Sequence, residues 1–135
     1  MPFGPAPLGI AYFAGVKLAG YSVAGYRINQ ICRTSKPHPA IFGLARTALG
    51  LVVDLSFGTL ALTFGVDHSE AVFYLALAPV RMGEWLLILW LFYRRLALTR
   101  AQFLGHAVAG SAWSYLLDFP AIMAVFALPG GAWIC

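Results

Sequence analysis

Charged residues are scarce in this sequence: only 10% of its 135 residues are Asp, Glu, Lys or Arg, whereas 61% are hydrophobic. A typical soluble domain has about 25% charged residues. A chain this short buries only about two-thirds of the surface that its unfolded form exposes. Lipid rather than water must therefore cover much of the apolar surface, which predicts an integral membrane protein.

Cysteine is also scarce, and the two present, Cys32 and Cys135, form no CxxC pair. This spacing gives no indication of a redox or metal centre. The net charge of +4 is not gathered into a basic stripe along a polar face. We therefore expect no nucleic-acid partner and no metal site.

Four long apolar segments, joined by short turns, make up most of the chain. A transmembrane helix needs about 20 predominantly apolar residues. The first turn closes with Pro37 and Pro39, and Thr99 is placed to cap the last segment. We predict one all-α domain, residues 1–135: an integral membrane four-helix transmembrane bundle with spans at about 8–26, 40–65, 71–93 and 101–128.

The basic residues outside the predicted spans are confined to the first and third turns. The N-terminal segment, the second turn and the C-terminal tail have none. Since cytoplasmic loops carry the excess of Lys and Arg, we predict that both termini lie on the non-cytoplasmic side of a bacterial inner membrane. The basic residues of the two turns are Arg27, Arg33, Lys36, Arg94, Arg95 and Arg100.

Small residues recur every four positions in the first and last predicted spans. Ala11, Gly15 and Ala19 form one such stripe. The last span contains Ala107 with Ser111 and Gly110 with Ser114. Stripes of this kind let helices approach closely in lipid. Contacts within the bundle and contacts with another chain explain them equally well.

Ionisable residues occur near the middle of every predicted span. A charge at the bilayer centre costs roughly 2.5–3.5 kcal/mol for Lys, Arg or Asp, so these side chains should face one another or a wet cavity. They either determine which helix lies beside which or form a midplane site for a substrate, ion or proton. The candidate midplane site consists of Lys17, Asp54, Arg81, Glu84, His106 and Asp118.

Depth in the membrane, taken from a rise of about 1.5 Å per residue, predicts which of these charges meet. Lys17 matches Glu84 in depth, and Arg81 matches Asp54. Arg81 and Glu84 also share one helical face, because they are three residues apart. Arg81 is therefore the expected hub of the cluster.

Arg46 and Asp118 are left over by this pairing, because their depths differ by about 15 Å. We expect Arg46 to extend toward the cytoplasmic surface. Asp118, with its short side chain, should hold a proton or face a water- or ligand-filled cavity. It is therefore the predicted functional carboxylate.

Three functions remain open from the sequence. The first is an accessory or interaction subunit of a membrane complex, whose partners are membrane lipid and other membrane protein chains or further copies of itself. The second is a small transporter or channel that uses the midplane charges. The third is a membrane-embedded enzyme acting on a lipid or quinone, with Glu84, Asp118 or His106 as acid or base. A lone membrane histidine favours a structural hydrogen bond over a haem or chlorophyll, and the sequence leaves the identity of any cofactor unknown.

Overall fold

Four α-helices make up the protein in a computed structural model, which describes residues 7–63, 70–96 and 98–127, with side chains at 11–53, 56, 59, 77–96 and 98–120. The helices are α1 (Pro7–Ile31), α2 (Pro39–Thr63), α3 (Glu70–Tyr93) and α4 (Arg100–Ala127). The predicted all-α, four-helix arrangement is confirmed. That residues 1–135 form a single domain stays a prediction.

The predicted membrane spans find no support in the hydropathy of these helices. In the part of the chain that the structure describes, no helix is at once long enough and apolar enough to cross a membrane. The expected ranges 8–26, 40–65, 71–93 and 101–128 are helical wherever the structure describes them, and residues 64, 65 and 128 lie outside the described residues. The transmembrane character of these helices is not shown.

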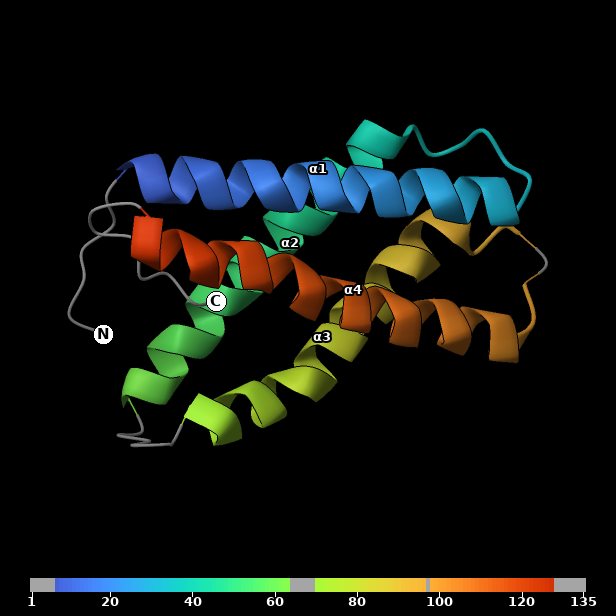
Figure 1. Cartoon of the computed structure of the whole chain (residues 1–135). Coiled ribbons are helices and arrows are strands. Elements are labelled where there is room, and N and C mark those ends of the chain that lie inside the picture. Colours follow the sequence, from blue (N-terminus) through green and yellow to red (C-terminus); the bar gives the residue numbers. More distant parts are fainter. Residues whose placement is uncertain (1–6, 64–69, 97, 128–135) are drawn as a thin grey trace.

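The helices form a closed ring in chain order: α1 packs on α2, α2 on α3, α3 on α4, and α4 returns to α1. Figure 1 shows α1 and α4 running in opposite directions, and α3 also runs opposite to α4. The turns after α1 and after α3 consequently lie at the same end of the molecule. Both turns also contribute residues that pack against one core, Cys32 from the first and Leu96 and Leu98 from the third.

The C-terminus of α1 is closed by a Schellman motif, in which one residue adopts a left-handed conformation. That residue is Arg33, with φ of 50°. Its amide donates to the carbonyl of Gln30 at 3.3 Å, and the amide of Thr34 donates to that of Asn29 at 3.0 Å. These bonds satisfy carbonyls at the helix end and turn the chain toward α2.

Thr99 caps α4 as the sequence predicts. The amide of Gln102 donates to Oγ1 of Thr99 at 3.2 Å, and the amide of Thr99 donates to Oε1 of Gln102 at 3.0 Å. This reciprocal pair is a capping box, which satisfies two backbone donors at the start of the helix.

Trp85 of α3 is the centre of the hydrophobic core and is fully buried. Its ring lies 5.9 Å from that of Tyr21 on α1 and 6.0 Å from that of Phe42 on α2. Gly110 of α4 lies directly against the Trp85 ring, so closely that an added Cβ would collide with it. The missing side chain of Gly110 thus makes room for the largest side chain of the core.

The small-residue stripes of the two helices face in different directions. On α4, Ala107, Gly110 and Ser114 are buried inside the bundle. On α1, Ala11, Gly15 and Ala19 are exposed. A Cβ added to Gly15 would meet no atom within 4 Å. The α4 stripe therefore serves packing within the bundle, and the α1 stripe does not.

Candidate functional site: the buried charge cluster

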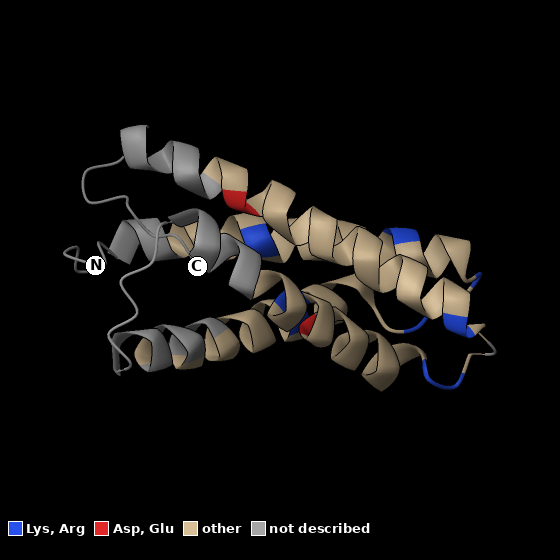
Figure 2. Cartoon of the chain, turned by 90° about the horizontal axis from the view of Figure 1, so that it is seen from below, with Lys and Arg blue, Asp and Glu red and all other residues tan. Residues whose placement is uncertain are grey.

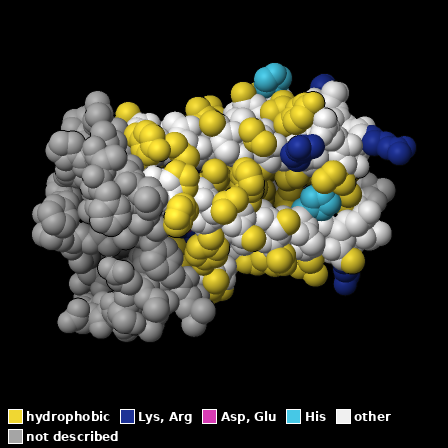
Figure 3. Space-filling model, in the orientation of Figure 1, with side chains coloured by type: hydrophobic (Ala, Val, Ile, Leu, Met, Phe, Trp, Pro, Cys, Tyr) yellow, Lys and Arg dark blue, Asp and Glu magenta, His cyan; other side chains and the backbone are white. Residues whose placement is uncertain are grey.

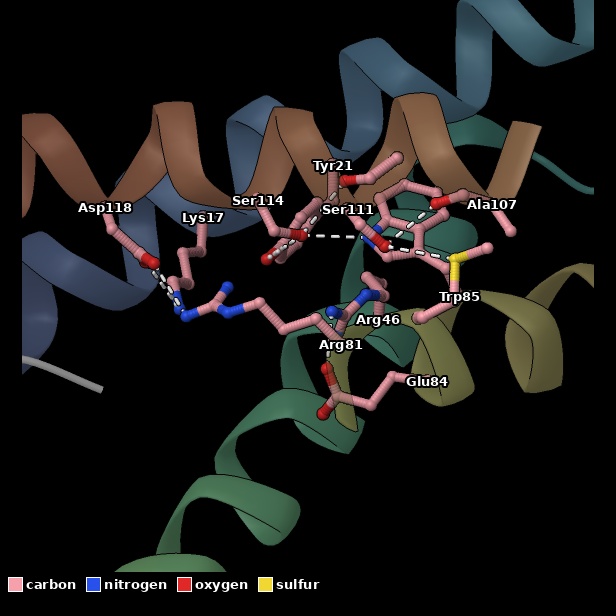
Figure 4. A network of polar contacts seen from close by, with 12 residues as sticks. Lys17, Tyr21, Arg46, Arg81, Glu84, Trp85, Ala107, Ser111, Ser114 and Asp118 are labelled. Atoms are coloured by element: carbon pink, nitrogen blue, oxygen red, sulfur yellow. Dashed lines mark hydrogen bonds and ion pairs between the residues drawn. The ribbon is translucent and has the colours of Figure 1, made fainter. Parts of the chain in front are cut away.

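Five charged side chains, contributed by all four helices, are buried between the helices. We call them the buried charge cluster, and Figure 4 shows how they point toward one another. Their exposed fractions are at most 6%. The cluster consists of Lys17 on α1, Arg46 on α2, Arg81 and Glu84 on α3, and Asp118 on α4.

Asp118 joins three helices. Nζ of Lys17 lies 3.1 Å from its Oδ1, and Nη2 of Arg81 donates to its Oδ2 at 2.6 Å. The expectation that Asp118 lacks a cationic partner is therefore wrong. The expected pairing of Lys17 with Glu84 is also replaced, since Lys17 meets Asp118.

The direction of the helices explains why the depth calculation failed for Asp118. Side chains on an α-helix lean toward the N-terminus of that helix. Because α1 and α3 run opposite to α4 (Figure 1), Lys17 and Arg81 lean toward Asp118 while Asp118 leans toward them. Positions along the helix axes alone do not include this convergence.

Arg46 pairs with Glu84, in contrast to the expectation that it reaches the cytoplasmic surface. Its Nη2 donates to Oε2 of Glu84 at 2.7 Å, and only 1% of the residue is exposed. The rings of Tyr21 and Trp85 lie 4.9 Å and 5.4 Å from the guanidinium carbon. Gly50, the next residue along this face of α2, leaves room for the guanidinium, because a Cβ there would lie 3.1 Å from Nη1.

The guanidinium of Arg46 is only partly satisfied by hydrogen bonds. Its Nε and Nη1 are buried and donate to no atom of the described residues. A cation over an aromatic face is stabilised by roughly 0.5–2 kcal/mol, with the larger value applying away from water. The two aromatic rings therefore compensate in part for the hydrogen bonds that Arg46 lacks.

The remaining two candidates from the sequence do not join the described contacts of the cluster. Asp54 lies within α2, but its side chain is outside the described residues, so its predicted pairing with Arg81 stays a prediction. His106 is half-buried near the start of α4, and its Nδ1 donates to the carbonyl of Gln102 at 2.6 Å. This bond lies within one turn of α4 and contacts no other helix.

Ser114 is the centre of a second polar network that the sequence analysis missed. Its Oγ accepts hydrogen bonds from the Tyr21 hydroxyl at 3.2 Å and from Nε1 of Trp85 at 2.9 Å, and it donates to the carbonyl of Gly110. Ser114 and Asp118 are four residues apart, so they lie on one face of α4. That spacing was the available signal, and Arg46 was omitted only because its depth suggested a role at the surface.

The arrangement offers ion pairs and hydrogen bonds, and its described part contains few groups suited to other chemistry. Among the described residues, no group of three or more His, Cys, Asp and Glu could hold a metal ion. Burial raises the pKa of the Cys32 thiol, which disfavours the thiolate that a nucleophile requires. The ion pairs of the cluster can therefore link all four helices, with Asp118 bound to two cations at once.

Comparison of the chain with protein-family models, curated proteins and solved structures finds no match.

Proposed function

We propose that the protein is a small four-helix integral membrane protein that acts as an accessory, interaction subunit of a membrane complex. The observation that carries this proposal is the reversal of the usual distribution of side chains. A water-exposed helix has its charged residues on the outside and its apolar residues toward the core. Among the described side chains, the five charged residues near the middle of the helices are buried, and many large apolar side chains are exposed.

The exposed apolar residues are distributed over all four helices. One from each helix illustrates this: Val23 on α1 is 51% exposed, Val52 on α2 62%, Leu87 on α3 51% and Leu116 on α4 60%. Figure 3 shows hydrophobic side chains spread over the face it presents, with Lys and Arg at one end. Each large apolar side chain left in water forgoes about 1.5–3 kcal/mol of burial free energy, so lipid is the solvent that suits this surface.

The exposed stripe on α1 supports a role in interaction. Small residues allow two helix backbones to approach closely in lipid, where van der Waals packing drives association. Within this bundle, the stripe of Ala11, Gly15 and Ala19 faces outward. We therefore propose this face of α1 as the docking surface for a helix of another membrane protein.

A fractionation experiment and a labelling experiment test the membrane proposal. The full chain should remain in the membrane fraction after alkaline carbonate washing and should require detergent for extraction. In a Cys32→Ser background, Ser35→Cys places a reporter on the exposed first turn, which we propose to be cytoplasmic. Impermeant maleimide applied to intact cells should label Cys135 and spare the reporter. Release by carbonate would contradict membrane insertion, and the reverse labelling would contradict the orientation.

Two exposed glycines provide a matched test of the docking surface. Gly15 on α1 and Gly83 on α3 both have open space around an added Cβ. Gly15→Leu should abolish recovery of the partner chain in detergent, whereas Gly83→Leu should retain it. If both variants retain the partner, the α1 stripe is not the docking surface. A symmetric homo-oligomer without any other chain would favour a transporter.

A small transporter is a second candidate, because Asp118 is shared by Lys17 and Arg81. An ion or proton that bound Asp118 would weaken contacts to α1 and α3 at once. Ion or proton flux in proteoliposomes, lost in Asp118→Asn, would support this candidate. The proposal of an enzyme has less support, since His106 bonds to its own helix and lies about 18 Å along α4 from Asp118.

A further inference from the structure

The nine Lys and Arg residues of the chain fall into two groups. Three belong to the buried charge cluster, and the other six are exposed and lie at the end formed by the first and third turns. Figure 2 shows basic residues gathered at this end. We call this group the cationic end: Arg27, Arg33, Lys36, Arg94, Arg95 and Arg100.

The sequence around the cationic end contains no acidic residue. Residues 27–45 and 91–106 include neither Asp nor Glu. Like charges this close repel one another unless a counter-anion is present. The nearest described carboxylates, Glu84 and Asp118, are already engaged inside the bundle. The cationic end is therefore complementary to a partner that brings negative charge from outside.

The two turns are held together, so the cations form one platform. The Tyr93 hydroxyl at the end of α3 donates to Oδ1 of Asn29 on α1 at 2.7 Å. Nδ2 of the same Asn29 donates to the carbonyl of Pro37 in the first turn, also at 2.7 Å. These two hydrogen bonds connect α1, the first turn and the end of α3 through buried or half-buried groups. Binding of an anionic surface therefore requires little further ordering of the protein.

Exposed apolar side chains border the cationic end on the helices behind it. Tyr26 is 53% exposed, Ile31 68%, Ile41 56%, Trp90 51% and Leu91 54%. The guanidinium of Arg94 lies 4.9 Å from the Trp90 ring. This pair therefore places a cation directly beside an exposed apolar ring. A nucleic acid or an acidic protein would leave this apolar border in water, whereas a bilayer covers it below its headgroups.

We infer that the cationic end is a binding surface for anionic phospholipid headgroups, with the apolar border in the acyl region beneath them. This inference rests on the proposed membrane function and specifies the lipid class at one end of the molecule. Each Lys or Arg near an anionic membrane surface contributes about 1 kcal/mol, which corresponds to about a fivefold preference for anionic lipid. Two cations together should contribute about 25-fold.

The test uses the purified full chain reconstituted in vesicles of phosphatidylcholine, with or without phosphatidylglycerol. Insertion is measured by flotation after alkaline extraction, and lipid preference by spin-labelled phosphatidylglycerol against spin-labelled phosphatidylcholine. The protein should insert in both vesicles and should prefer phosphatidylglycerol. The double substitution Arg94→Gln with Arg95→Gln should lower that preference by about 25-fold, whereas Arg94→Lys with Arg95→Lys should preserve it.

Salt provides a second measurement that needs no variant. The Debye length falls from about 10 Å at 0.1 M to about 3 Å at 1 M ionic strength, so the preference of the wild-type chain should decline over this range. At matched ionic strength, inorganic phosphate should compete no better than chloride, because the surface fits a lipid layer rather than a free anion.

The outcomes separate this inference from the proposed function. Insertion in both vesicles without preference for phosphatidylglycerol would overturn the inference alone. Specific competition by inorganic phosphate would also overturn it and assign the cations to a free anion. Failure to insert in either vesicle would overturn the proposed function, and the inference with it.

Discussion

Buried and exposed cations of this chain illustrate how position changes the role of one residue type. Arg46 and Arg81 lie in the interior, each within 2.7 Å of a carboxylate oxygen on another helix. Arg95 and Arg100 lie exposed at the cationic end, where the surrounding sequence has no acidic residue. The first two residues join neighbouring helices through ion pairs, and the second two face outward at the cationic end.

The energetic consequence of this difference follows from desolvation. A charge removed from water is costly, and only its partner and hydrogen bonds offset the cost. When one member of a buried pair is removed, the desolvation cost of the other member is no longer offset. An exposed cation is already solvated, so its removal changes the free energy of unfolding little. Four sets of substitutions test this comparison, in order of decreasing effect.

Asp118→Leu should have the largest effect, because Lys17 and Arg81 both lose the carboxylate that they share. Breaking a buried ion pair costs about 3–5 kcal/mol, so the free energy of unfolding in detergent should fall by at least this amount. Leu116→Ala, at a 60% exposed position on the same helix, is the control and should change it far less. Unchanged stability of Asp118→Leu would show that the cluster does not hold the bundle together.

A double-mutant cycle on Arg46 and Glu84 measures how strongly the two buried charges depend on each other. Arg46→Met alone should cost about 3 kcal/mol, since Glu84 loses this cation. The double variant Arg46→Met with Glu84→Leu should recover most of that loss, because apolar residues of similar size often replace a buried pair without net cost. Denaturant unfolding of the wild type, Arg46→Met, Glu84→Leu and the double variant gives the coupling free energy between the two residues. If the two single effects simply add, the pair is not coupled.

Two glycines of α4 extend the comparison from charge to packing. Gly110→Ala should destabilise the protein by about 1–3 kcal/mol, because the new Cβ overlaps the Trp85 ring. Gly105→Ala, where an added Cβ meets nothing within 4 Å, should stabilise it by about 0.5–1 kcal/mol through lower backbone entropy of the unfolded chain. Equal effects would contradict the buried and exposed faces assigned to α4.

Arg95→Gln should have the smallest effect of the four. The side chain is exposed, and a surface substitution of this kind changes the free energy of unfolding by at most about 0.5 kcal/mol. Thermal unfolding in detergent measures this change, with Arg46→Met measured under the same conditions for comparison. A loss of stability comparable to that of Arg46→Met would contradict the separation of the nine cations into two groups.

Local features of the fold were accessible from the sequence because they depend on neighbours in the chain. Thr99 and Gln102 are three residues apart, so their capping box follows from spacing alone. The four helices themselves follow from four long apolar segments separated by polar or proline-containing turns. Four of the five buried charges were also predictable, since Lys17, Arg81, Glu84 and Asp118 interrupt apolar runs, whereas Arg46 was expected at the surface.

Only the tertiary structure decided which partners meet. The depth calculation treated each charge as a point on its own helix axis, whereas Lys and Arg side chains extend well beyond it. Lys17 and Arg81 consequently meet Asp118, and Arg46 extends along α2 past Gly50 to reach Glu84. The same holds for the small-residue stripes, whose spacing is identical on α1 and α4. Rotation of each helix about its axis, set by packing around Trp85, turns one stripe inward and leaves the other exposed.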